Sequence, residues 1–326
     1  MLDSIDASLA PLLEPGRPVA LVNYPNHPNP GDNAIWLGTL MTLRRLGVPV
    51  RYTSTPAGFS EVAMRRAVGT GTLLLNGGGN FGDVYPGQQE LREHVLARCT
   101  DRAIVQLPQS IWFRSESNLE RMRRLCAAHP DFTLLVRERR SAEFAGREFG
   151  LPARLCPDMA FGLGALAPGR PPHRELLWIA RCDAEAVARA VPPGVPARDW
   201  IVPDPADGMS ERERRALGLN RALLAFMKRD ERHANRRAKT LSVTFEPLAS
   251  AWVRRGLEIV SSAGVIVTDR LHAHIFALLL GIPHVVLDNS YGKVRSTFET
   301  WTAASGLAAW ADDAADALRA ATALGR

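Results

Sequence analysis

The sequence has little of what marks a secreted, membrane-spanning or metal-binding protein. Its four cysteines, Cys99, Cys126, Cys156 and Cys182, are widely spaced and form no C-x-x-C pair. We therefore expect reduced thiols, and neither a disulfide framework nor a zinc site. No apolar run reaches the roughly 18 residues that a membrane-spanning helix needs. The stretch Met1–Asp6 carries two acids and lacks the basic residues that open a signal peptide. These absences predict a cytoplasmic protein without a bound metal.

What the chain does have is the composition of a folded protein. It contains 326 residues, of which 46% are hydrophobic and 23% are charged, and such values are ordinary for globular domains. This length exceeds that of a single hydrophobic core, which typically takes about 100–150 residues. The length therefore predicts two domains.

The net charge of +6 is concentrated in one stretch of the chain. Residues 210–240 contain ten Lys and Arg against four Asp and Glu, so the remainder sums to zero. Such a stretch can contact anionic lipid headgroups at the inner face of a membrane, or a polyanionic acceptor. It can equally be a solvated pair of helices whose Leu217, Leu224 and Met227 pack inward. We expect no nucleic-acid partner, because no aromatic platform or known binding motif accompanies the charge.

Short apolar runs alternate with longer amphipathic segments, a pattern typical of parallel sheets covered by helices. A Pro- and Gly-rich stretch, residues 167–172, interrupts the alternation as a linker would. We predict the α/β fold class with two Rossmann-like domains, residues 1–166 and 175–304, facing each other across a cleft. The alanine-rich residues 305–326 are predicted to form a terminal helix that packs back on the first domain. The predicted strands are residues 19–23, 72–76, 103–107, 133–136 and 154–156, then 176–180, 200–202, 264–268 and 284–287, with helices at 33–46 and 61–67.

A glycine-rich segment follows the second predicted strand. Residues 76–82, Asn-Gly-Gly-Gly-Asn-Phe-Gly, contain the G-x-G-x-x-G pattern of dinucleotide-binding folds. That motif also needs an acid at the end of the next strand to hold a ribose, and here the strand ends in Leu107-Pro108-Gln109. A dehydrogenase is therefore the weakest reading. Gly77, Gly78, Gly79 and Asn80 still allow close backbone approach to a sugar or an anion, although a plain tight turn would use the same residues.

A second polar segment follows the first predicted strand. It reads Asn-Pro-Gly-Asp-Asn at residues 29–33. Asp32 is expected to cap the helix that follows, and Asn29, Asp32 and Asn33 also suit hydrogen bonds to sugar hydroxyls at the mouth of the cleft. The two roles are compatible.

The strongest local pattern lies at residues 268–274. A buried strand runs directly into Thr268-Asp269-Arg270-Leu271-His272 and then into an apolar helix. Arg270 and His272 therefore stand at a helix N-terminus, which favours an anion. A guanidinium fork matches carboxylate or phosphate oxygens, and an imidazole can move a proton near neutral pH. Both can serve one ligand if Arg270 lies at or before the helix cap. His274 is expected to face the core or a supporting partner.

With these motifs in hand, the sequence resembles the polysaccharide pyruvyl transferase family. The matching segments are residues 29–33, 76–80, 107–110, 136–141, 157–161, 269–283 and 291–294, which occur in the family's order. The resemblance implies a two-domain GT-B-like fold. It also implies transfer of the pyruvyl group of phosphoenolpyruvate onto sugar hydroxyls of an exopolysaccharide or cell-wall glycan precursor, giving a pyruvate ketal. The basic residues 210–240 match no motif of the family.

The resemblance assigns roles to particular residues. Donor binding falls to Arg137, Arg270, Leu271 and His272, with Lys293 as a further cation. Phosphoenolpyruvate carries a carboxylate and a phosphate that contributes about −1.5 to −2 charges, so its site needs fixed cations. His272 is the candidate general acid, with phosphate binding alone as its other reading, and Asp32 is a guess for the base. The reaction needs no cofactor beyond its donor.

Two other functions compete with this one. A GT-B glycosyltransferase would use a nucleotide-sugar, but it would want an acid for the ribose in the second domain, where Glu299 is the only candidate. A non-catalytic module that contacts carbohydrate or a membrane through residues 210–240 would leave Arg137, Arg270 and His272 without a role. The acceptor is not encoded in any motif, and a lipid-linked oligosaccharide is one candidate.

Overall fold

A computed structural model describes most of the chain. The described residues are 1–182, 186–187, 190–200, 209–227, 241–290 and 292–325. The predicted strand at 200–202 and the basic residues 228–240 therefore lie largely or wholly outside them.

The chain forms two compact units that do not follow simple sequence boundaries. The first unit comprises Met1–His27, Ile35–Gly162 and Gly208–Ser250. The second comprises Pro28–Ala34, Leu163–Asp207 and Ala251–Arg326. The split near residue 163 lies close to the predicted linker. Two segments differ from the prediction, because Pro28–Ala34 belongs with the second unit and Gly208–Ser250 with the first.

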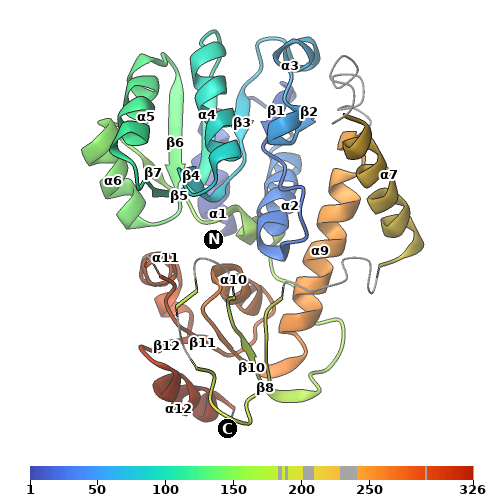
Figure 1. The fold of residues 1–326 in the computed structure, drawn as a ribbon, viewed down its shortest axis with the longest axis vertical. Coiled ribbons are helices and arrows are strands. Elements are labelled where there is room, and N and C mark those ends of the chain that lie inside the picture. Colours follow the sequence, from blue (N-terminus) through green and yellow to red (C-terminus); the bar gives the residue numbers. More distant parts are fainter. Residues whose placement is uncertain (183–185, 188–189, 201–208, 228–240, 291, 326) are drawn as a thin grey trace. The chain divides into compact units, whose positions relative to one another are not determined.

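The first unit is built on a seven-stranded sheet (Figure 1). Its strand order is β2-β1-β3-β5-β6-β7, with β4 beside the second half of β5, and its pairings are parallel. Side chains from the helices α3, α4, α5 and α6 share one apolar cluster with the strands. The strands are β1 (Val19–Val22), β2 (Val50–Ser54), β3 (Leu73–Leu75), β4 (Gly78–Gly82), β5 (Ile104–Trp112), β6 (Phe132–Val136) and β7 (Arg154–Leu155).

The helices of the first unit begin and end where short polar residues and glycine permit. Ser60 caps α3 through a bond from Ala63 N, and Ser115 caps α5 through a bond from Asn118 N, as oxygen-bearing side chains do at N-caps. Gly150 ends α6 in the left-handed conformation, which glycine adopts without steric cost. The helices are α1 (Leu2–Leu9), α2 (Pro30–Arg45), α3 (Glu61–Val68), α4 (Pro86–Arg98), α5 (Glu116–Ala128), α6 (Arg139–Phe149) and α7 (Glu211–Met227), with 3₁₀ turns η1 (Ala10–Leu12), η2 (Pro56–Gly58) and η3 (Met159–Leu163).

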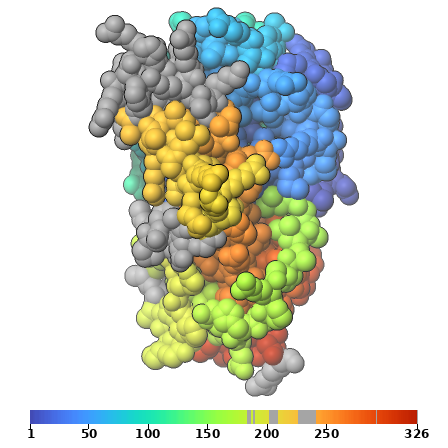
Figure 2. Space-filling view, turned by 90° about the vertical axis from the view of Figure 1, so that its right-hand side faces the viewer, coloured from blue at the N-terminus to red at the C-terminus, as the bar shows by residue number. Residues whose placement is uncertain are grey.

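Helix α7 carries the described part of the basic stretch. Ser210 and Glu213 form a reciprocal capping box, in which Glu213 Oε2 accepts from Ser210 N at 2.8 Å, and this fixes where the helix starts. Its arginines are exposed, and Figure 2 shows the helix, in yellow, at the surface of the molecule. Leu217 and Leu224 are half-buried, in keeping with a solvated helix that packs one side inward.

The second unit is built on a five-stranded sheet. Its order is β12-β11-β10-β8-β9, again with parallel pairings. Helix α9 (Phe245–Val260) begins in the first unit and ends in the second. The other elements are β8 (Arg174–Ile179), β9 (Ala197–Arg198), β10 (Ala263–Thr268), α10 (Leu271–Leu279), β11 (His284–Val286), α11 (Lys293–Thr297), η5 (Phe298–Thr302), η6 (Ala303–Ser305), β12 (Ala308–Trp310) and α12 (Ala314–Leu324).

The C-terminal segment differs from its prediction in two ways. Ala308–Trp310 is the edge strand β12, paired with β11, and the helix begins only at Ala314, where Asp313 caps it. Ala317 and Ala321 of that helix pack into the apolar cluster of β8, β10 and β11. Helix α12 therefore covers the sheet of its own unit, because small alanine side chains let it lie close to the strands.

Two histidines form a buried chain of hydrogen bonds in the second unit. His284 Nδ1 lies 2.8 Å from the Ile282 carbonyl and therefore carries the proton that is donated to it. His284 Nε2 then accepts from His274 Nδ1 at 2.6 Å, and His274 Nε2 accepts from Thr302 Oγ1 at 2.8 Å. This chain requires both rings to be neutral. His274 thus supports the core, as expected.

Acidification is expected to destabilise the second unit through this pair. Burial lowers the pKa of His284 to about 4 and that of His274 well below its usual value. The unfolded chain takes up both protons near pH 6.5, so the stabilising contribution is complete above that pH and is lost as the pH falls toward 4. The loss for His284 alone is on the order of 3 kcal/mol.

Urea unfolding between pH 7 and pH 4 measures this loss. The double variant His274→Leu/His284→Leu should show a flatter pH dependence than the unmodified protein, because neither residue can then bind a proton. An equally steep dependence in the double variant would assign the acid sensitivity to other groups.

Candidate functional site

Both sheets reverse their winding beside their first strand. In the second unit the strand order changes direction between β8 and β10, and in the first unit it changes between β1 and β3. Ligands of open α/β sheets bind outside the carboxyl ends of the strands at such a reversal. The segments that follow these four strands contain most of the polar residues singled out from the sequence.

In the second unit, side chains tie the loops after β8 and β10 together. Thr268 Oγ1 donates to the Ile179 carbonyl at 2.9 Å and accepts from Arg270 N at 3.0 Å. Asp269 Oδ1 accepts from Arg181 N at 2.9 Å. Asp269 is 5% exposed, and its burial raises the pKa of the carboxyl. These bonds fix the backbone from which Arg270 projects.

Arg270 is the N-cap residue of α10, with extended backbone (φ −98°, ψ 116°). It therefore lies at the cap, the position from which it can share a ligand with the following turn. Its side chain is 3% exposed, and Nη2 lies 2.5 Å from Asp199 Oδ2. Trp200 stands beside the guanidinium, with its ring centroid 5.8 Å from Cζ. A buried cation held by one carboxylate is a preformed anchor for an anion.

Asp199 is a site residue that the sequence analysis missed. It directly follows β9, and Oδ1 and Oδ2 accept backbone N–H groups from Trp200 at 2.7 Å and Cys182 at 3.2 Å. The predicted strand began at Trp200, whereas the observed strand ends at Arg198. The sequence signal for this residue is an acid at the carboxyl end of a strand. The sequence analysis missed it because the predicted strand starts at Trp200, after Asp199.

His272 lies in the first turn of α10 against the backbone of α2. A Cβ atom built on Gly31 would lie 2.3 Å from His272 Nδ1 and 2.7 Å from its Cβ. Only glycine leaves room for the imidazole there. His272 itself is half-exposed. The glycine at this point of the polar segment thus sets the position of the histidine.

The rest of that polar segment folds on itself. Asn29 Oδ1 accepts from Gly31 N at 3.1 Å, so Asn29 performs the capping that was predicted for Asp32. Asn29 Nδ2 donates to Asp32 Oδ2 at 2.7 Å, and Asn33 Nδ2 donates to the Asn29 carbonyl at 2.8 Å. Asp32 cannot be the cap because α2 already begins at Pro30. These bonds hold Asn29, Asp32 and Asn33 in one turn, next to the glycine that contacts His272.

Two further predicted donor residues lie at helix starts in the second unit. Leu271 is the first residue of α10 and its side chain is 2% exposed, so any ligand contact must come through its backbone N–H. Lys293 opens α11, is 9% exposed, and its N–H donates to Asn289 Oδ1 at 3.1 Å. First-turn N–H groups have no acceptor within the helix and are suited to anions.

The glycine-rich segment is a strand and not a phosphate-binding turn. Gly78–Gly82 forms β4, and helix α4 begins only at Pro86. A Cβ on Gly77 would lie 2.8 Å from the Pro108 carbonyl oxygen, and one on Gly82 (φ +139°) would lie 1.7 Å from that of Trp112. These glycines therefore let β4 approach β5. The dinucleotide fingerprint, which opens a helix, is absent here, and this removes the remaining basis for a dehydrogenase.

Arg137 lies at the end of β6 and is 1% exposed. Its Nη1 lies 2.7 Å from Asp158 Oδ2, its Nε donates to Ser110 Oγ at 2.8 Å, and Glu138 Oε2 lies 3.7 Å from Nε. Glu138 in turn accepts from Ser110 and Ser141. Two carboxylates thus surround a guanidinium that was predicted to bind the donor, and this network joins the motif residues of 107–110, 136–141 and 157–161.

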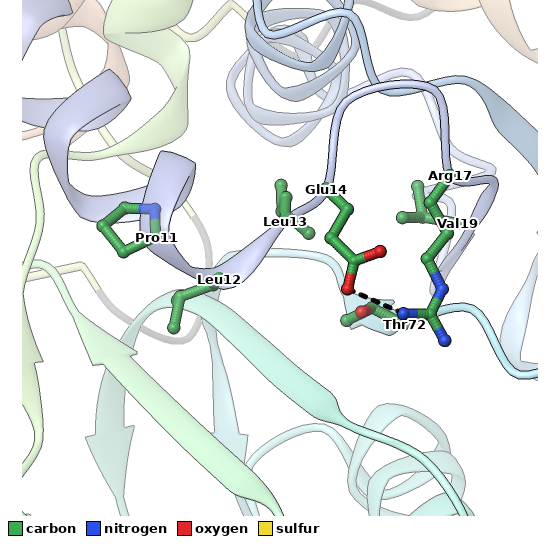
Figure 3. A pocket seen from close by; sticks show the side chains of 7 residues that line it. All are labelled: Pro11, Leu12, Leu13, Glu14, Arg17, Val19 and Thr72. Carbon is green, nitrogen blue, oxygen red and sulfur yellow. Dashed lines mark hydrogen bonds and ion pairs between the residues drawn. The ribbon is translucent and has the colours of Figure 1, made fainter.

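A small cavity lies away from these loops. It has a volume of about 120 Å³ and lies at the amino ends of β1 and β3, the edge opposite the polar loops. Figure 3 shows the side chains that line it. Ligand pockets are usually at least about 300 Å³. No group of His, Cys, Asp or Glu within the described residues could hold a metal. In that same part of the chain, no helix combines the length and apolarity needed to cross a bilayer.

Gly31→Ala is expected to destabilise the second unit by about 1–3 kcal/mol, because the new methyl group overlaps the His272 side chain. Urea unfolding measures the loss, and the imidazole nitrogen signals of His272 should shift in NMR spectra. Gly87→Ala is the matched control, because nothing lies within 4 Å of a Cβ at that position of α4, where alanine favours the helix. Equal stability of the two variants would contradict the contact.

Comparison with known proteins identifies a family that covers most of the chain. The family model for polysaccharide pyruvyl transferase matches residues 29–291. The chain is similar to "Pyruvyl transferase 1" of Schizosaccharomyces pombe, with 31% identity over 309 residues that cover 87% of this chain and 70% of that protein. It is also similar to EpsO of Bacillus subtilis, named as a pyruvyl transferase, with 30% identity over 284 residues that cover 87% of this chain and 85% of that one.

A solved structure shares the fold. It is a Klebsiella pneumoniae protein, KP1_0663, with a TM-score of 0.60 and 17% identity, covering 95% of this chain and 96% of that one. At this identity the likeness concerns the fold alone. The family model matches most of the length of the chain, and two relatives named as pyruvyl transferases are at least 30% identical to it. The chain belongs to the polysaccharide pyruvyl transferase family.

Proposed function

We propose that this protein transfers the pyruvyl group of phosphoenolpyruvate onto two hydroxyls of a sugar in an exopolysaccharide or cell-wall glycan precursor. The observation that carries the proposal is the pairing of Arg270 and His272 at the N-terminus of α10. A buried guanidinium at the cap and a partly exposed imidazole two residues later, in the first turn of the helix, suit a small donor that carries a carboxylate and a phosphate and must also be protonated. Membership of the family supports the same reaction class.

The donor would be anchored first by Arg270. Asp199 holds this guanidinium in a fixed direction. The first-turn N–H groups of α10, including that of Leu271, and the ammonium group of Lys293 would add to the positive field. Arg137 remains a predicted ligand of the donor. The cleft between two GT-B-like domains, in which Arg137 would act, also remains a prediction.

The chemistry then follows from the electronic structure of the donor. Protonation of C3 makes C2 electrophilic, and one sugar hydroxyl adds to C2. The C2–O bond to phosphate breaks, inorganic phosphate departs, and a second hydroxyl closes the ketal ring. The two hydroxyl protons balance the one gained by C3 and the one that leaves with phosphate. No oxidation occurs, so the proposed reaction requires no redox cofactor.

His272 is the proposed acid for C3. A positioned acid contributes on the order of 10²–10⁴ in rate, and Gly31 fixes the ring against α2. Asp32 is the proposed base for the hydroxyl, because Asn29 Nδ2 holds its carboxylate in the same turn as the glycine that contacts His272. Asn33 completes this turn, and Gly77, Gly78, Gly79 and Asn80 are proposed acceptor contacts. We also propose a cytoplasmic location, with contact to a membrane surface through residues 210–240.

The donor can be tested with ligands alone. Phosphoenolpyruvate should raise the melting temperature more than UDP-, GDP- or NAD-type ligands at equal concentration, because it places two anionic groups on a site built for them. Incubation with phosphoenolpyruvate and a panel of methyl glycosides and lipid-linked sugars should release phosphate. The modified sugar should gain the mass of pyruvate less one water. Equal stabilisation by a nucleotide-sugar, with glycosyl transfer, would favour a glycosyltransferase instead.

Variants of the two central residues should separate binding from chemistry. Arg270→Ala should abolish the stabilisation by phosphoenolpyruvate. His272→Asn should keep part of that stabilisation and reduce turnover by about 10²-fold or more. Arg319→Ala, an exposed arginine of α12, and His173→Asn, an exposed histidine, are controls from the same unit. Near-native turnover by His272→Asn would remove its role as the acid.

A further inference from the structure

One buried amide in the first unit has no hydrogen-bond partner. Asn76 directly follows β3 and is 3% exposed. Its backbone is fully used, because N donates to the Val22 carbonyl and O accepts from Gln106 and Gln109. Its side-chain Oδ1 is buried and unpaired. Rotating the amide by 180° would only put its nitrogen in the same position. A buried polar group without a partner destabilises the fold, which marks this position as one that a ligand can satisfy.

The side-chain amide of Asn80 is held by its oxygen, so that its nitrogen Nδ2 can donate to a ligand. Asn80 Oδ1 accepts from Arg92 Nη2 at 2.9 Å and from Gln109 Nε2 at 3.0 Å, and Asn80 N donates to Gln109 Oε1 at 3.1 Å. The same Gln109 nitrogen also contacts the Asn76 carbonyl. With Oδ1 engaged twice, the amide cannot rotate freely. Its Nδ2 takes part in none of the described hydrogen bonds.

The space beside that nitrogen is kept clear by glycine. A Cβ on Gly78 would lie 3.7 Å from Asn80 Nδ2 and 3.4 Å from Ile35 Cδ1. Gly78 has φ +131°, a conformation that L-residues rarely adopt. Any residue with a side chain would therefore be strained here and would fill the space next to Nδ2.

Arg92 strengthens this donor. It is 1% exposed, and its described hydrogen bonds run to neutral groups, with Nε at 2.7 Å from Gln106 Oε1 and Nη1 at 2.5 Å from Gln89 Oε1. Its Cζ lies 4.2 Å from the Phe81 ring centroid. Burial lowers the pKa of Arg92 to about 9, so it remains charged at neutral pH. A cation on Oδ1 polarises the amide and makes Nδ2–H a better donor.

We propose that Asn76 and Asn80 form a subsite for one hydroxyl of the neutral sugar acceptor, and that Arg92 is its positioning residue. The assignment to the acceptor rests on the proposed function. The hydroxyl would donate its proton to Asn76 Oδ1 and accept from Asn80 Nδ2. A carboxylate or a phosphate monoester dianion has no proton to give to Asn76, so the pair selects an alcohol over these anions. Both residues stand at the strand reversal beside β1 and β3, where ligands of such sheets bind.

Asn80→Asp is the most informative variant. The carboxylate can still accept from Arg92 and Gln109, and it gives Arg92 the negative partner that it lacks, so the melting temperature should stay the same or rise. The donor Nδ2 is lost, which should weaken glycoside binding about tenfold. Stabilisation by phosphoenolpyruvate should not change. The probes are the methyl glycosides of galactose, glucose, mannose and N-acetylglucosamine, titrated by NMR without phosphoenolpyruvate.

Two further variants separate a binding role from a structural one. Asn76→Leu removes the unmet amide, so it should raise the melting temperature while weakening glycoside binding. Arg92→Lys keeps the charge but loses the fork, so it should raise the KM for the glycoside and leave that for phosphoenolpyruvate unchanged. Asn118→Ala, whose amide contacts Asp83 and none of these groups, is the control and should bind glycosides normally.

The outcomes distinguish this subsite from the proposed function. Unchanged glycoside binding by Asn80→Asp, no binding of any of the four glycosides to the unmodified protein, or displacement of the glycoside by acetate in the unmodified protein but not in Asn80→Asp would each overturn the subsite. If the unmodified protein binds a glycoside that Asn80→Asp binds weakly, yet no phosphate is released from phosphoenolpyruvate, the subsite stands and the proposed reaction fails.

Discussion

The loops at the polar edges of the sheets are fixed by the need to give buried guanidinium groups hydrogen-bond and charge partners. Four arginines of the described residues are almost completely excluded from water, and three of them, which lie near the candidate sites, have different partners. Arg137 is surrounded by two carboxylates, Arg270 has one carboxylate beside an aromatic ring, and Arg92 is held by amides. Because removing a charge from water is costly unless its partners replace the solvent, the surrounding backbone is fixed to keep those partners in place. The ordering of the loops after β3, β6 and β10 follows from this.

The three environments also differ in how directly each arginine can interact with a ligand. Arg137 has its charge balanced inside the fold, which suits a residue that holds motif segments together. Arg270 sits at a helix start, whose dipole adds to its field, so an incoming anion gains from both. Arg92 acts through Asn80 and reaches a ligand only by way of that amide. In the proposed function, Arg270 therefore binds the donor directly, whereas Arg92 acts on the acceptor through the amide of Asn80.

The sequence predicted the strands well because periodicity reports burial directly. Predicted and observed strands agree within one or two residues for β1, β3, β6, β7, β8, β10 and β11, and β5 runs on well beyond its predicted end. The failures have physical causes. Gly78–Gly82 reads as a turn, yet pairing with β5 makes it a strand, since tertiary contact overrides the low strand propensity of glycine. Ala308–Trp310 was predicted as part of a helix because alanine favours helices. These residues instead pair with β11 and form the edge strand β12.

The site was predictable in its residues but not in their partners. Arg270 and His272 were found because a strand, polar residues and an apolar helix occur in order. Asp199 and Gln109 were not assigned, because a contact across tens of residues leaves no mark on local pattern. The unmet amide of Asn76 could not be read from the sequence at all. It arises because Gln106 and Gln109 donate to the backbone carbonyl of Asn76, whereas no group donates to its side-chain Oδ1.

The division of the chain has a consequence for its synthesis. The first unit includes Gly208–Ser250, and Tyr24 stacks on Phe245 with ring centroids 3.9 Å apart while its hydroxyl donates to the Phe245 carbonyl. A nascent polypeptide released by the ribosome only as far as the linker near residue 167 would lack this stacking partner. Completion of the N-terminal half must wait until more than two-thirds of translation has passed. Contacts between residues so far apart in the sequence slow folding, and the first unit is completed only after the linker and the first strand of the second unit have been synthesised.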